Sequence, residues 1–149
     1  MSYILQSLKI AKEYAKHSKC SDKQVGCVLL SREGDQLSEG INWLVDGSKT
    51  CDRCKTHKGL SCPAIHAEIN AIINLAQSYT QKQKPYILVS TLEPCIECTK
   101  ALINLHIKEV YYESPTSDRK TGRSLWNNYW REHPECRWQQ IQYPVQEDC

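Results

Sequence analysis

Residues 65–112 read IHAEINAIINLAQSYTQKQKPYILVSTLEPCIECTKALINLHIKEVYY, and this stretch decides the predicted fold. Its first part, residues 65–76, places apolar side chains at helical spacing. The apolar run at residues 86–90 is short, as expected for a buried strand, and a second helix opens at Pro94. Residues 107–112 are rich in β-branched and aromatic side chains and predict another strand. This order of helix, strand, helix and strand predicts a layered α/β domain.

The flanking sequence extends the alternation of helices and strands. The further predicted elements are a helix at residues 3–17, strands at 25–30 and 36–42, a helix at 124–132 and a strand between 136 and 143. Residues 43–63 have no apolar period and are rich in Gly, Lys, Asp and Cys, which predicts a long functional loop. We expect one α/β domain over residues 1–149, with helices on both faces of one sheet.

Composition narrows the class of protein. The formal net charge of +2 over 149 residues is far from the strongly basic balance of a dedicated nucleic-acid binder. No apolar run is long enough to span a bilayer, and the N-terminal segment lacks the apolar core of a signal peptide. The nine cysteines are therefore expected to stay reduced and available to metal. We expect a cytoplasmic protein that acts on a small molecule, with no membrane partner, and a nucleic acid is the less favoured partner.

Three potential zinc ligands lie at the two helix starts within residues 65–112. Cys95 and Cys98 are three residues apart, so they share one helix face, and their side chains lean towards the helix N-terminus. The positive end of that helix and a metal ion both favour the thiolate form. His66, at the start of the other helix, is the candidate third ligand. Three protein ligands leave one tetrahedral position for a water whose pKa falls to about 7, which is typical of a catalytic zinc.

Glu68 is the predicted proton shuttle of this centre. It lies two residues after His66 in the first helical turn, where a carboxylate can relay protons beside the metal. The alternative is a purely structural zinc module, because a lone C-x-x-C motif is often a zinc knuckle or a redox pair. The combination of a His-x-Glu motif, a strand and a Pro-Cys-x-x-Cys motif favours catalysis.

The two motifs resemble the H-x-E and P-C-x-x-C pattern of zinc deaminases. Other segments are similar to the cytidine and deoxycytidylate deaminase family, namely residues 18–20, 25–28, 40–42, 66–72 and 107–112, with Cys62 before His66. The resemblance covers roughly residues 1–115. It implies a three-layer α/β/α fold of the cytidine deaminase type, in which helices flank a mixed five-stranded sheet.

The resemblance also implies an activity. Deoxycytidylate deaminases hydrolyse dCMP to dUMP and ammonia in pyrimidine nucleotide metabolism and use Zn²⁺ as cofactor. They form homo-oligomers, and the resemblance implies a homo-hexamer for this chain. They are regulated by dCTP and dTTP, and a nucleotide effector would bring Mg²⁺ with it. Trp43 departs from the family pattern, which has a glycine there. An indole fills space that glycine would leave for the close approach of a nucleotide.

Three substrate contacts follow from the resemblance. Asn42 would hydrogen-bond the sugar hydroxyl, the Ala67 main chain would contact the pyrimidine carbonyl, and Tyr111 would lie near the base. From the residues alone, an asparagine after a strand is equally an ordinary turn residue. A basic loop before the predicted helix at residues 124–132 offers candidates for binding a 5′-phosphate, with a solvated surface loop as the alternative. Its three cations are Arg119, Lys120 and Arg123.

A second, structural zinc is predicted in the loop at residues 43–63. Cys51, Cys54, His57 and Cys62 lie close together there at zinc-like spacing, and Cys20 could complete a closed set of four ligands. The loop has no apolar core, so a zinc ion would supply folding energy that its side chains cannot. The alternative is a disordered loop with reduced thiols.

The zinc chemistry alone leaves the substrate open. Residues 91–95 are also similar in tRNA adenosine deaminases and riboflavin-pathway deaminases, so another nucleotide, a base or a tRNA is the alternative substrate. Trp126 and Trp130 lie four residues apart on a predicted helix, where packing is a more usual role than base stacking. We therefore expect a nucleotide, dCMP, as the substrate.

Overall fold

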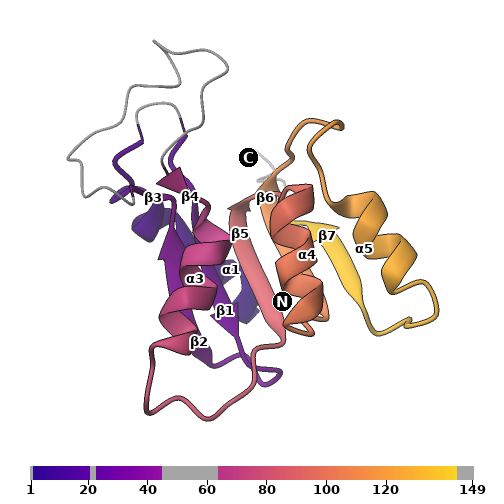
Figure 1. Cartoon of the computed structure of the whole chain (residues 1–149), viewed down its shortest axis with the longest axis horizontal. Helices are drawn as coiled ribbons and strands as arrows, with labels where there is room; N and C mark the ends of the chain where they lie inside the picture. The colour runs from indigo at the N-terminus through magenta and orange to yellow at the C-terminus, as the bar shows by residue number, and fades with distance from the viewer. Residues whose placement is uncertain (1, 21–22, 45–63, 144–149) are drawn as a thin grey trace, which may run out of the picture.

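The computed structural model describes residues 2–20, 23–44 and 64–143. Its main sheet has five strands in the order β2-β1-β5-β6-β7. β1 pairs antiparallel with β2 and with β5, whereas β5, β6 and β7 run parallel. The strands are β1 (Gly26–Leu30), β2 (Gln36–Ile41), β5 (Ile87–Leu92), β6 (Glu109–Ser114) and β7 (Arg137–Gln140). The mixed five-stranded sheet predicted above is therefore confirmed (Figure 1).

Helices cover both faces of this sheet. α1 (Ser2–Ala15) lies on one face, and α3 (Ala67–Ala76), α4 (Ile96–Asn104) and α5 (Arg123–Tyr129) lie on the other (Figure 1). The structure thus has the predicted α/β/α layers, with helix boundaries within a few residues of those expected. None of the described helices is long and apolar enough to cross a membrane.

Two apolar clusters separate the three layers. On β1, Val28 and Leu30 belong to the cluster beneath α1, whereas Cys27 and Leu29 belong to the cluster beneath α3 and α4. Successive strand residues point to opposite faces, so a strand with helices on both sides is a continuous apolar run. This explains why every residue of β1, with the sequence GCVLL, is buried.

A second, two-stranded ladder corrects one sequence prediction. β3 (Trp43–Leu44) pairs antiparallel with β4 (Ala64–Ile65), so the predicted loop does not begin at Trp43. The two strands are distant in the sequence and too short to show a period, so only the folded chain reveals the pairing. Residues 45–63, the rest of the predicted loop, lie outside the described residues.

Close packing of α3 against β2 sets the position of the first zinc-ligand motif. A Cβ atom on Gly40 of β2 would lie 2.2 Å from the Ala67 carbonyl oxygen and 2.4 Å from the Ala71 nitrogen. Only glycine allows this approach of helix to strand. The start of α3 is thereby held against the sheet beside the start of α4 (Figure 1).

Candidate metal centre and catalytic pocket

The starts of α3 and α4 bring three potential metal ligands together. His66 is the N-cap residue of α3 and Cys95 is the N-cap residue of α4, and neither side chain caps its own helix. His66 Nδ1 lies 3.2 Å from Cys98 Sγ and 3.5 Å from Cys95 Sγ. All three ligand atoms lie within 4.8 Å of one another. No other set of three His, Cys, Asp or Glu side chains in the described residues comes as close.

These distances fit a tetrahedral zinc site. Zinc binds imidazole nitrogen at about 2.0 Å and thiolate sulfur at about 2.3 Å, which places the two ligand atoms about 3.5 Å apart. The observed separations of 3.2 and 3.5 Å are close to this value. A set of two thiolates and one imidazole with a fourth position left open is typical of a catalytic zinc.

The pKa values of the two cysteine thiols are shifted by their neighbours. Hydrogen bonds from Cys98 and from His66 lower the pKa of the Cys95 thiol to about 3, which favours its thiolate form. The pKa of Cys98 is raised, because its proton is held in the hydrogen bond to Cys95. Metal ligands must be deprotonated, so zinc binding would displace that proton. Both sulfurs then act as thiolate ligands.

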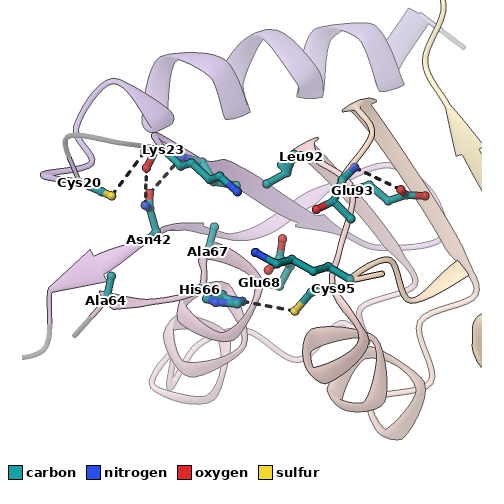
Figure 2. A pocket seen from close by; sticks show the side chains of 13 residues that line it. Cys20, Lys23, Asn42, Ala64, His66, Ala67, Glu68, Leu92, Glu93 and Cys95 are labelled. Carbon is teal, nitrogen blue, oxygen red and sulfur yellow. Dashed lines mark hydrogen bonds between the residues drawn. The ribbon is translucent and has the colours of Figure 1, made fainter. Parts of the chain in front are cut away.

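Glu68 lies beside the candidate ligands without belonging to the set. It is in the first turn of α3 and only 4% exposed. Burial raises the pKa of its carboxyl group above the ordinary value. A carboxyl group with a raised pKa is better matched to taking and returning protons near neutral pH. Figure 2 shows the Glu68 side chain next to His66 and Cys95.

A cavity of about 290 Å³ opens over this centre, which we call the catalytic pocket. Its size is close to the lower end, about 300 Å³, of the usual range for small-ligand sites. His66, Glu68 and Cys95 lie in its wall together with the apolar residue Leu92 (Figure 2). The apolar Val25 also lines it. The pocket therefore offers an apolar surface for a planar ring next to the metal ligands.

Comparison with known proteins decides the family. The sequence model described as "Cytidine and deoxycytidylate deaminase zinc-binding region" matches residues 1–114. The chain belongs to the cytidine and deoxycytidylate deaminase family. This membership confirms the resemblance seen in the sequence and supports Zn²⁺ as the metal of the His66, Cys95 and Cys98 centre.

Curated relatives of this deaminase family match much of the chain. It is 32% identical over 109 residues to a probable deoxycytidylate deaminase of Caenorhabditis elegans. It is 30% identical over 135 residues to a deoxycytidylate deaminase of Schizosaccharomyces pombe (strain 972 / ATCC 24843). The alignments cover 70% and 83% of this chain but 54% and 40% of the relatives. The chain thus spans about half the length of these relatives.

A solved structure of the same family agrees in fold. The dCMP deaminase of the cyanophage S-TIM5, in its apo form, is similar with a TM-score of 0.68 and 25% sequence identity. The match covers 85% of this chain and 91% of the phage chain. The three-layer fold of the cytidine deaminase type is therefore confirmed.

Two of the substrate contacts that the deaminase resemblance implied lie in the wall of the catalytic pocket, Asn42 and Ala67. The Asn42 side chain is fixed by the backbone: its Oδ1 accepts from the Val25 nitrogen at 3.0 Å, and its Nδ2 donates to the Lys23 oxygen at 2.6 Å. An amide has two acceptor and two donor positions, so each end can still make one further hydrogen bond. These contacts hold the amide in one orientation at the pocket wall (Figure 2).

Tyr111 is placed differently from the expectation. It lies on β6 opposite Val89 of β5, in the apolar cluster beneath α1, and is not part of the lining of the catalytic pocket. Its hydroxyl donates to Glu109 Oε1 at 2.6 Å. Strand alternation is the cause, because it turns Tyr111 towards α1 and the adjacent Tyr112 towards α4. We therefore leave Tyr111 out of the substrate contacts.

The three cations of the basic loop occupy three different environments. Lys120 lies in the lining of the catalytic pocket. Arg123 instead forms an ion pair with Glu93, with an Nη2 to Oε2 distance of 3.1 Å. Arg119 is exposed and not in the pocket lining. Of the three candidates for binding the 5′-phosphate, the structure thus brings only Lys120 to the pocket lining, and the phosphate contact stays a prediction.

Three further residues of the pocket were not predicted from the sequence. Lys23, Glu93 and Thr116 line it, although none belongs to the zinc motifs. A signal for Glu93 existed, because a carboxylate next to a buried strand needs a partner. Lys23 and Thr116 had no local signal, since both lie in connections whose course depends on the fold.

Cys20 is the one described member of the proposed second zinc set. It is 6% exposed and lines the catalytic pocket, and its sulfur accepts a hydrogen bond from the Lys23 nitrogen at 3.5 Å. Cys51, Cys54, His57 and Cys62 lie outside the described residues. The second zinc therefore stays a prediction.

Proposed function

We propose that this protein is a zinc hydrolase that converts dCMP and water into dUMP and ammonia. One observation supports this most directly: His66 Nδ1, Cys95 Sγ and Cys98 Sγ lie within 4.8 Å of one another. The buried carboxyl group of Glu68 faces the same catalytic pocket. Membership of the deaminase family and the similarity to deoxycytidylate deaminases support the reaction and the substrate.

The chemistry divides between the metal and Glu68. Zinc, when bound by His66, Cys95 and Cys98, is a Lewis acid that lowers the pKa of a bound water to about 7. Glu68 accepts a proton from the attacking water and passes it to N3 of the cytosine ring. The water oxygen bonds to C4 in this first transfer. Glu68 then moves the remaining proton of the new C4 hydroxyl to the 4-amino group, so the C4–N bond breaks, ammonia leaves and the C4=O double bond of uracil forms. The raised pKa of Glu68 suits both transfers.

The rest of the pocket orients the nucleotide. The fixed amide of Asn42 offers a donor and an acceptor to the sugar hydroxyl, and the Ala67 main chain offers hydrogen bonds to the pyrimidine carbonyl. Lys120 and Lys23 are cations in the lining and supply the charge for a 5′-phosphate. A nucleoside without the phosphate would lose that attraction.

Regulation and assembly belong to the same proposal. We expect a homo-oligomer, in the form of a hexamer, and dCTP and dTTP as effectors with Mg²⁺ accompanying the nucleotide. Trp43 is 46% exposed and lies with Tyr14, Ile65 and Ile73 around a separate surface hollow. Its indole occupies space there that the family's glycine would leave open, so we expect weaker effector responses than in relatives with that glycine.

Ammonia release from a substrate panel tests the function. The purified zinc-loaded protein is given dCMP, dCTP, CMP, deoxycytidine, guanine and a tRNA at equal concentrations. We expect the highest kcat/KM with dCMP. A preference for the tRNA would assign the same zinc chemistry to a polynucleotide, and no turnover of any substrate would leave only the structural zinc module.

A further inference from the structure

Glu93 is a buried carboxylate that the proposed chemistry does not use. It follows β5 and precedes Pro94 and the metal ligand Cys95. Its side chain has no solvent exposure, whereas the side chain of its partner Arg123 is 43% exposed. A carboxylate without solvent is costly unless charged and hydrogen-bonded partners surround it. The identity of these partners shows what Glu93 holds together.

Both oxygens of Glu93 are occupied by donors from distant parts of the chain. Arg123 donates through Nε to Oε2 and through Nη2 to Oε1, each at 3.1 Å. Trp138 Nε1 of β7 donates to Oε2 at 2.7 Å, and the Thr116 backbone nitrogen donates to Oε1 at 3.3 Å. Bidentate contacts between arginine and carboxylate fix the relative orientation of the two groups and also add to the binding energy. Glu93 therefore links the metal-ligand segment to residues 116–123 and to the last strand.

Backbone contacts align the same two segments. The Ile96 nitrogen donates to the Lys120 oxygen at 2.9 Å, and the Gly122 nitrogen donates to the Pro94 oxygen at 3.1 Å. Thr116, bound by Glu93, lies before Lys120 in the chain, and Arg123 lies after it. The Glu93 carboxylate thus holds both sides of the turn that places Lys120 in the pocket lining.

We propose that Glu93 is a positioning residue for recognition of the substrate's phosphate. Its carboxylate holds residues 116–123 against the metal-ligand segment, so that Lys120 stays in the pocket wall. Arg123 acts through Glu93 and does not itself bind the phosphate. This inference rests on the proposed function, because it assigns the role to a phosphate-bearing nucleotide.

Two of the three metal ligands are held independently of Glu93. His66 and Cys98 are held by α3 and α4 and make no hydrogen bond to Glu93 in the described structure, whereas Cys95, the N-cap residue of α4, also pairs with Thr121. Loss of the carboxylate charge would loosen residues 116–123, which keep their backbone bonds to Pro94 and Ile96, while α3 and α4 still hold the metal ligands. The expected effect is therefore on KM for a phosphorylated substrate, with little effect on kcat.

The principal experiment measures steady-state kinetics of the zinc-loaded wild type and Glu93→Gln. Glutamine keeps the shape of the side chain but loses the charge that Arg123 binds. We expect KM for dCMP to rise at least about tenfold while kcat stays within about threefold. The inhibition constant of dUMP should rise in parallel, whereas that of deoxyuridine, which has no phosphate, should not. Equal weakening of dUMP and deoxyuridine, or a loss confined to kcat, would overturn the inference.

A second series keeps the inference testable if Glu93→Gln does not fold. Arg123→Lys retains the charge but not the two-pronged contact, and Arg123→Gln loses both. We expect KM for dCMP to rise in that order, and Trp138→Phe, which removes one donor to Glu93, to give a smaller rise. If Arg123→Gln raises KM while a folded Glu93→Gln leaves it unchanged, Arg123 binds the phosphate directly and the inference is wrong.

The outcomes also separate this inference from the proposed function. An inactive zinc-loaded wild type would overturn the proposed function, and this inference with it. An active wild type whose KM is unchanged in Glu93→Gln would overturn the inference alone. Zinc content and the unfolding transition of each variant show whether the metal centre and the fold are intact.

Discussion

The catalytic pocket has two sides that differ in how they are built. The metal side consists of His66, Glu68 and Cys95 in the pocket lining, together with the buried ligand Cys98, all at the starts of two helices. The basic side consists of residues 116–123, whose three cations lie in a short run of sequence but occupy separate environments. Spacing along a helix determines which side chains share a face. Spacing along a loop does not determine which side chains lie together. Substitutions on the two sides should therefore have different effects.

Loss of a metal ligand should have the largest effect. In Cys98→Ala only two ligands remain at the catalytic zinc, and we expect deaminase activity below detection, because three protein ligands are needed to hold the ion. Elemental analysis should give one zinc ion fewer per chain in the variant than in the wild type. Wild type stripped by a chelator should regain activity with added zinc, and Cys98→Ala should not. Recovery of the variant would remove Cys98 from the metal side.

Loss of the proton shuttle comes next. Glu68→Gln should lower kcat about 10²- to 10⁴-fold, because glutamine cannot take up and return protons. Its zinc content should match that of wild type, because Glu68 is not in the ligand set. Ammonia release together with elemental analysis provides the measurement. Near-normal turnover by the zinc-loaded variant would show that the acid and base chemistry resides elsewhere.

On the basic side, two neighbouring residues form a matched pair. Lys120→Met should raise KM for dCMP about 10- to 100-fold, as expected from about 1.5–3 kcal/mol for a hydrogen bond to a charged group. Arg119→Met removes the same charge from the same loop, but Arg119 is not in the pocket lining. Its KM should be close to that of wild type. Equal rises in KM for the two variants would mean that the total charge of the loop matters and the position of each cation does not.

Overpacking between the basic side and α4 should lower stability moderately, and we expect this effect to be smaller than the effects on catalysis described above. A Cβ atom on Gly122 would lie 1.8 Å from Thr99 Oγ1. Gly122→Ala should therefore lower the free energy of unfolding by about 1–3 kcal/mol, the usual cost of overpacking. Denaturant unfolding measures the change, with Thr99→Ala as the control. The double variant, Gly122→Ala with Thr99→Ala, should recover part of the lost stability, because alanine at position 99 removes the Oγ1 atom that the new Cβ atom would meet. Strictly additive losses would show that these atoms do not clash.

The smallest expected effect is a pH dependence of stability through Glu93. Burial alone would raise the pKa of Glu93, but hydrogen bonds from Trp138 and Arg123 outweigh it and lower the pKa below 4.5. The stabilisation is therefore fully present above pH 4.5 and is lost as the pH falls through the lower folded-state pKa. Thermal unfolding of wild type and Glu93→Gln should differ most above about pH 5 and converge in acid. A constant difference would show that Glu93 does not titrate with folding.

The sequence by itself determined the fold class and the metal side. Apolar periods predicted the helices and strands, and the C-x-x-C spacing placed Cys95 and Cys98 on one helix face. The resemblance to the zinc-deaminase pattern placed His66 and Glu68 beside them. These features are local, because helix geometry fixes the directions of side chains three or four residues apart. The boundaries of the elements shifted by a few residues, as expected where helices and strands end.

Only the tertiary structure decided the rest of the pocket. Lys120 lines the pocket, Arg123 pairs with Glu93, and Tyr111 faces α1 on the other side of the sheet. Each depends on contacts between segments far apart in the sequence, or on which face of the sheet a strand residue meets. Such contacts leave no period in the sequence, because they are fixed by how sheet, helices and loops pack together. The charge of a residue is therefore evident from the sequence, but its partner is not.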